Sequence, residues 1–209
     1  MPKQTDLPKL KKNSLRKVEL SKLRFQLFEV TVRSKDYLLL RWVAAMSLIE
    51  LHAIWERYAE LRLIVALNHN PTHFISENGI KGIKSIPRGL SQVLTRGNKD
   101  YFDFRTIADL ISQGNRLVGK NKNPFAFLKG TDDLKYLDTL NAIRNRIAHA
   151  SEKSLRDYKE KVKGSFGMKY IPEPDEFLNA LDLRRHSPVY GRKRLFVLHE
   201  IVSKAIRNS

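Results

Sequence analysis

Residues 134–150, Leu-Lys-Tyr-Leu-Asp-Thr-Leu-Asn-Ala-Ile-Arg-Asn-Arg-Ile-Ala-His-Ala, carry the pattern that decides the expected fold. This stretch and the two acidic residues at 132 and 133 predict one amphipathic helix with acids at its N-terminal end, where the helix dipole favours them. The apolar positions recur at intervals of three or four residues: Leu134, Leu137, Leu140, Ile143 and Ile147.

The same helical spacing recurs along the chain, and no clear strand alternation accompanies it, so the sequence predicts an all-α helical bundle. Residues 1–13 are expected to form a basic flexible tail, followed by a single domain over residues 14–209. The domain core is expected over about residues 38–158. Glycine and proline punctuate residues 70–102, which predicts an irregular insertion between helices, and a C-terminal helix is expected near residues 192–207.

The first helix is expected to begin at Ser14, a favourable N-cap residue. Its apolar residues follow a three-four-three spacing that predicts one buried stripe and leaves a short coiled-coil arm as an alternative. These residues are Leu20, Leu23, Leu27 and Val30.

The most apolar run, residues 37–51, includes Arg41, Ser47 and Glu50. It is too short and too charged to cross a bilayer, so we expect a buried helix and no membrane partner. The basic N-terminus lacks the apolar core of a signal peptide, and the absence of cysteine suits a reducing compartment. A cytoplasmic protein is therefore expected.

Charge favours a polyanionic partner. The chain has 39 Lys and Arg against 22 Asp and Glu, a formal net charge of +17, which favours nucleic-acid binding through counterion release. A basic surface without a nucleic-acid partner is the alternative. No glycine-rich phosphate loop precedes a helix, and His69 and His73 are separated by Pro71 without a third ligand, so neither a cofactor nor a metal is expected.

Arg144 and His149 give the motif helix its candidate chemistry. Histidine can move a proton on or off a ribose 2′-hydroxyl near neutral pH, and a guanidinium can hold the phosphate. On a continuous helix the two residues would point roughly 140° apart. Similar spacings occur at Arg62–His69 and Arg194–His199, but only the 144–149 copy combines a following asparagine with a well-patterned helix.

The segment Arg144-Asn145-Arg-Ile-Ala-His149 resembles the Arg-x4–6-His signature of the HEPN superfamily, and the helix around Trp55 and Glu56 resembles an early helix of its prokaryotic members. The closest likeness is to RiboL-PSP-type HEPN proteins of bacterial toxin and defence systems. The resemblance implies an all-α bundle that dimerises with two motifs facing each other, and a metal-independent endoribonuclease. Some members of the superfamily are adenylylated on a tyrosine two positions after the histidine. This chain differs from them, because that position is Ser151.

Other residues receive supporting roles. Glu56 is either a solvated helix residue or an orienting partner for Arg144 or His149. Arg146 is either a surface charge or an RNA contact. Lys120 and Lys122, in a glycine- and lysine-rich loop, are expected to bind RNA.

These observations predict an endoribonuclease that leaves 2′,3′-cyclic phosphate ends, acting as a toxin or antiviral-defence effector. His149 would serve as general acid or base, Arg144 would bind the scissile phosphate, and Asn145 would bind substrate or orient the arginine. A homodimer could share the catalytic pair across chains, and a cognate antitoxin or defence-system protein could bind it. The alternative is a non-catalytic RNA-binding or protein-interaction module on the same fold.

Overall fold

A computed structural model describes residues 6–32, 36–97, 99–183 and 191–209. These residues form no strand, only one isolated antiparallel bridge between Leu181 and Lys193, so the all-α prediction is confirmed for them. The elements are α1 Leu7–Val32, α2 Tyr37–His69, α3 Thr72–Glu77, α4 Arg88–Arg96, α5 Ile107–Val118, η1 Lys120–Lys122, η2 Ala126–Leu128, α6 Asp132–Ala148, α7 Glu152–Phe166, α8 Pro174–Asn179 and α9 Arg194–Asn208.

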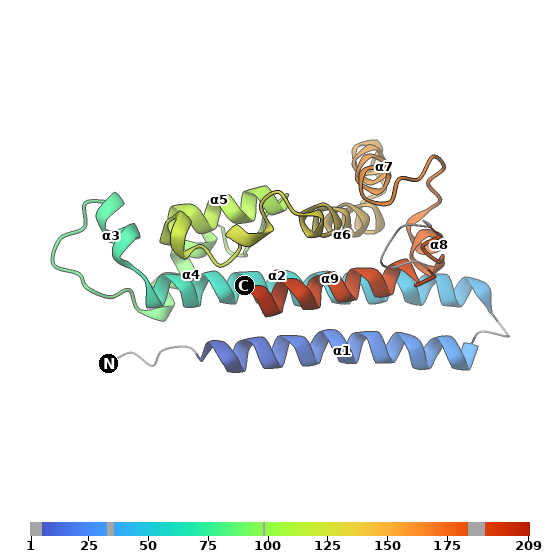
Figure 1. The fold of residues 1–209 in the computed structure, drawn as a ribbon, viewed down its shortest axis with the longest axis horizontal. Coiled ribbons are helices and arrows are strands. Elements are labelled where there is room, and N and C mark those ends of the chain that lie inside the picture. The colour runs from blue at the N-terminus through green and yellow to red at the C-terminus, as the bar shows by residue number, and fades with distance from the viewer. Residues whose placement is uncertain (1–5, 33–35, 98, 184–190) are drawn as a thin grey trace.

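The long helix α2 lies at the centre (Figure 1). In that view α1 runs along one side of α2, and α4, α5 and α6 cover the other, with α7 beyond α6. Helix α9 overlaps α2 in the view and contacts both α1 and α6. Asp36 caps α2 by accepting a hydrogen bond from the Leu39 amide at 2.9 Å, and Pro71 follows its last turn. By length and composition α2 could cross a membrane, but 44% of its most apolar window is buried inside the protein.

Aromatic rings fill the core along α2. Trp55 is fully buried, stacks with Tyr58 at 6.2 Å and meets Phe125 edge-on at 5.8 Å. Phe125 thereby anchors the loop of residues 119–127 to the core. Large buried aromatic surfaces of this kind dominate the packing energy of a small helical domain.

The N-terminal helix differs from the sequence prediction in two respects. It begins at Leu7, so residues 7–13 belong to α1 and not to a tail, while residues 1–5 lie outside the described residues. Ser14 is therefore an interior residue of α1, 8% exposed, and not its N-cap. The predicted buried stripe is also wrong, because Leu27 and Val30 are 72% and 78% exposed.

Residues 70–102 are partly helical, because α3 and α4 lie within them. Ile86, Phe74 and Phe102 are buried, whereas Leu90 and Val93 are 46% and 60% exposed. The segment runs directly into residues 101–105, which form one wall of the candidate site.

Candidate functional site

Helix α6 ends one residue before His149. Thr131 caps its N-terminus, with Asp132 and Asp133 in the first turn, and Leu137, Leu140 and Ile143 are fully buried along one face, as predicted. His149 is the C-cap: its backbone is extended, with φ −135° and ψ 108°. The angle expected from a continuous helix therefore does not apply to its side chain.

The backbone of His149 is held from both directions. Its amide donates to the Asn145 carbonyl at 2.9 Å, and its own carbonyl accepts from the Ser154 hydroxyl. The same hydroxyl reaches the Ser151 carbonyl at 2.8 Å, while the Ser151 side chain caps α7 by accepting from the Ser154 amide at 3.2 Å. These contacts fix the joint between α6 and α7, and with it the position from which the exposed imidazole projects.

Both members of the motif line one cleft of about 500 Å³. Helix α6 and its C-cap form one wall, α2 forms another, and the segment before α5 forms the third. The volume falls within the range of about 300–1,000 Å³ typical of ligand sites. The lining residues are His52, Glu56, Tyr101, Phe102, Asp103, Phe104, Arg105, Asn141, Arg144, Asn145 and His149.

His52 and Asn141 form the polar floor. The His52 Nε2 atom lies 3.1 Å from the Asn141 side-chain oxygen, which assigns the proton to Nε2, and both residues are nearly buried. Burial, reinforced by the nearby Arg144 charge, lowers the pKa of His52 to about 4. A neutral His52 at physiological pH can orient Asn141 but does not supply a proton to substrate.

Arg144 and Glu56 supply opposite charges to the cleft. The Arg144 guanidinium donates to the Asn145 side-chain oxygen at 3.0 Å, so these two motif residues are linked directly. Burial raises the pKa of the half-buried Glu56 carboxyl, while Arg144 acts in the opposite direction. Glu56 is thus close enough to Arg144 to feel its charge.

The segment before α5 is tied to α6 and to its own flanks. Asp138 of α6 accepts from the Ile107 amide at 2.7 Å, and Thr106 and Asp109 cap each other at the start of α5. Lys99 pairs with Asp103 at 2.9 Å. This anchoring places Arg105 at the rim of the cleft.

A second hollow of about 590 Å³ adjoins the cleft along α6 and α7. Arg105, Asn145 and His149 line both hollows, so His149 stands where they meet. The second hollow adds Lys153 and Lys161 from α7, although Lys161 is 3.3 Å from Asp138. The arrangement is a groove with space on both sides of His149.

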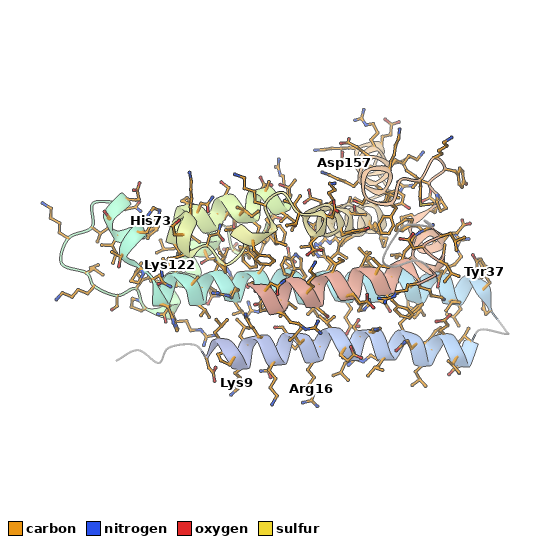
Figure 2. All side chains as sticks on the ribbon, in the orientation of Figure 1. Lys9, Arg16, Tyr37, His73, Lys122 and Asp157 are labelled. Atoms are coloured by element: carbon orange, nitrogen blue, oxygen red, sulfur yellow. The ribbon has the colours of Figure 1, made fainter. Side chains whose placement is uncertain are left out.

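Three predicted RNA contacts lie outside this groove. Arg146 pairs with Glu173 at 3.4 Å, with only 18% of its side chain exposed. Lys120 and Lys122 are exposed on η1 but line neither hollow. Figure 2 shows Lys122 toward the α3 end of the molecule, far from Asp157 of the second hollow.

The two other Arg–His spacings do not form comparable sites. His199 is 1% exposed, its Nδ1 lies 2.9 Å from the Leu195 carbonyl, and burial lowers its pKa to about 4. The Arg194 guanidinium lies over the Phe177 ring at 4.8 Å. His69 is exposed in the last turn of α2 and lines neither hollow, so only the 144–149 copy opens onto the groove.

Sequence reasoning missed His52, Asn141 and Arg105. The four-residue interval from His52 to Glu56 was an available signal, because such residues share one helix face. Asn141, Arg144 and Asn145 likewise share a face of α6. No sequence pattern marks Arg105, which reaches the cleft through the tertiary contacts of Asp138.

Comparison with family models, curated proteins and solved structures gives no match for this chain. The HEPN likeness therefore rests on the motif of residues 144–149 and its helical setting, and the functional argument rests on the geometry of the groove.

Proposed function

We propose that this all-α chain is a HEPN-like, metal-independent endoribonuclease. The observation that carries the proposal is the meeting of Arg144, Asn145 and His149 of one chain in one cleft, with a second hollow beginning at His149. A small-molecule enzyme needs one enclosed pocket, whereas a polymer-cleaving enzyme needs room for a residue on each side of the scissile bond. The groove meets the second requirement.

The proposed reaction uses the substrate's own nucleophile. The His149 imidazole takes the proton of a ribose 2′-hydroxyl, whose oxygen attacks the adjacent phosphorus. The bond from phosphorus to the 5′-oxygen breaks, and that oxygen takes a proton from the imidazolium or from water. Arg144 donates to the phosphate oxygens as negative charge accumulates. The products are a 2′,3′-cyclic phosphate and a 5′-hydroxyl.

Charge and chemistry favour RNA as substrate. DNA lacks the 2′-hydroxyl that the reaction requires. Arg105 and Lys153 line the groove beside Asp157 and Glu160, so it is the formal charge of +17 that favours a polyanion. Asn145 serves to orient Arg144, because its side-chain oxygen already accepts a bond from the guanidinium.

The biological setting follows from the resemblance alone. A toxin or antiviral-defence effector in the cytoplasm, held inactive by a cognate partner, is the setting in which such an enzyme acts. The cleft of one chain already contains Arg144 and His149, which removes the geometric reason to share them across a dimer. We therefore propose that each chain carries a complete site.

The test is incubation of the purified protein with mixed RNA in EDTA. We expect cleavage by the natural protein, none by His149→Ala or Arg144→Ala, and unchanged cleavage by His69→Ala, with equal helical content by circular dichroism. RNA binding without cleavage by the natural protein would favour the alternative, a non-catalytic RNA-binding module. Equal cleavage by His149→Ala would remove this site from consideration.

A further inference from the structure

Helix α1 has a second apolar face, which it turns outward while Val18, Phe25 and Phe28 pack against the core. The face that it buries against the domain includes two serines and a glutamate: Ser14, Val18, Ser21, Phe25 and Glu29. The exposed face carries an outer stripe, defined here as Leu20, Leu23, Leu27 and Val30, whose exposures are 39%, 49%, 72% and 78%. A monomeric soluble protein rarely leaves such a contiguous apolar patch in water.

The outer stripe points away from the rest of the domain. At about 100° per residue, its centre lies roughly opposite the buried face and on the same side as Lys9 and Arg16. Figure 2 shows Lys9 and Arg16 extending from α1 away from α2. In Figure 1 no described element lies on that side of α1.

We propose that the outer stripe binds the outer stripe of a second copy of this chain, as a short parallel coiled coil in register. The spacing 20, 23, 27, 30 supplies alternating a and d positions, the pattern that seats side chains of one helix between those of another. The charged Lys9 and Arg16 continue the same face toward the N-terminus and limit the contact to about two heptads.

The charges beside the stripe match a parallel partner. Glu19 and Arg24 are exposed and flank the stripe on opposite sides, at the g and the following e position. In a parallel dimer a g residue faces the e residue five positions later on the partner helix. The twofold axis therefore brings Glu19 of each copy to Arg24 of the other, giving two ion pairs.

A membrane surface is the competing partner for this end of the molecule. Tyr37, Leu38 and Trp42 at the start of α2 are also exposed, at 60%, 72% and 59%. A lipid surface selects a broad apolar face with basic neighbours. It does not select heptad spacing or the Glu19–Arg24 interval, so the observations favour a second copy.

This dimer keeps the two clefts apart. Helix α1 lies on one side of α2, and α6, which carries Arg144, lies on the other (Figure 1). The two copies join at α1, so each groove faces outward and is complete without the partner. The inference does not rest on the proposed ribonuclease activity, because association is measured without substrate.

Single cysteines test the register, since the chain has none of its own. In the parallel dimer two Leu20→Cys residues lie within the Cα separation of about 4.4–6.8 Å that a disulfide requires. In an antiparallel pair centred on the stripe, residue 20 lies opposite residue 30, about 15 Å from its own copy. We expect Leu20→Cys to form a cross-linked dimer on mild oxidation. The control Val93→Cys on α4, at a more exposed position, should stay monomeric on denaturing gels.

Charge reversal tests the proposed ion pairs. Glu19→Lys chains repel one another at both pairs, and so do Arg24→Glu chains, whereas a mixture of the two restores two attractive pairs. In an equimolar mixture, native mass spectrometry should find the mixed dimer at well over twice the amount of either homodimer, which is the ratio that random pairing alone gives. Arg24 also pairs with Glu50 at 2.6 Å within its own chain. Each Arg24→Glu chain loses this pair whether it joins a homodimer or a mixed dimer, so the loss does not favour either one.

Light scattering gives the outcome that would overturn the proposal. We expect a dimer at micromolar concentration, and a folded monomer for Leu23→Glu with Leu27→Glu. A monomeric natural chain whose Leu20→Cys form does not cross-link would refute the dimer. Stripe-dependent co-sedimentation of that monomer with phosphatidylserine vesicles would assign the face to a membrane instead.

Discussion

Acid should destabilise this protein through His52, which lies on the floor of the cleft. The pKa of His52 is lowered from 6.5 to about 4, first by burial and then by the Arg144 charge. The unfolded chain therefore binds a proton at this residue below pH 6.5, while the folded protein resists it until about pH 4. Stability is full above pH 6.5 and is lost as the pH falls through that window.

The expected size follows from the two pKa values. The interval from 6.5 to about 4 corresponds to a loss of about 3 kcal/mol in the free energy of unfolding, at about 1.4 kcal/mol for each pH unit. His199, whose pKa is also lowered to about 4, should contribute a similar loss independently. Together they would remove much of the stability of about 5–15 kcal/mol that is typical of a domain.

The assay is urea unfolding at a series of pH values between 7 and 4. His52→Gln can still donate to Asn141 but does not titrate, so its stability should fall less steeply with decreasing pH, by up to about 1.4 kcal/mol per pH unit. Ser47→Ala, another nearly buried position on α2, should shift the whole curve without changing its slope. Equal slopes for His52→Gln and the natural protein would refute the reasoning.

Three further changes test the groove. Glu56→Gln removes a carboxylate whose pKa is raised by burial, so the free energy of unfolding should rise at neutral pH and this gain should fade in acid. RNA cleavage should fall in the same variant. A loss of stability at neutral pH would contradict this reasoning. Ser154→Ala removes the hydroxyl that holds the His149 backbone, so it should lower the free energy of unfolding by about 1 kcal/mol. It should also lower kcat more than it changes KM, and an unchanged kcat would exclude a role of Ser154 in positioning His149. Arg105→Gln should reduce the slope of log affinity for RNA against log salt by about one, and Lys120→Gln by less; the reverse order would place RNA outside the groove.

Periodicity was enough to predict most helices. The stripe of α6 and the C-terminal helix lie close to their predicted limits, and the buried run over residues 37–51 forms the first half of α2, because each presents one apolar face or is apolar around most of its circumference. Helix α2 continues to His69 as one helix, since neither proline nor glycine interrupts it between Asp36 and Pro71.

The orientation of α1 could not be predicted in this way. A helical repeat shows that Leu20, Leu23, Leu27 and Val30 share a face, but not what covers that face. In the structure the small Ser14 and Ser21 allow α1 to approach its neighbours closely, and the Ser21 hydroxyl bonds Glu50 of α2 at 2.9 Å. The interior thus takes the face with better polar and steric fit to α2 and α9, leaving the leucines outside.

The candidate site was only partly accessible to sequence. The motif predicted that Arg144, Asn145 and His149 belong to the site. The angle predicted between the Arg144 and His149 side chains does not apply, because α6 ends at Ala148 and His149 has an extended backbone. Helix ends depend on capping partners, here the Ser151 and Ser154 contacts that begin α7. The cleft itself depends on long-range contacts.

The ends of the RNA products test the central claim most directly. After incubation in EDTA, mass spectrometry should find 2′,3′-cyclic phosphates on the upstream fragments and 5′-hydroxyls on the downstream fragments, and His149→Ala should produce neither. Fragments ending in 3′-hydroxyls and 5′-phosphates, or products that persist in His149→Ala, would contradict cleavage through the ribose 2′-hydroxyl at this site.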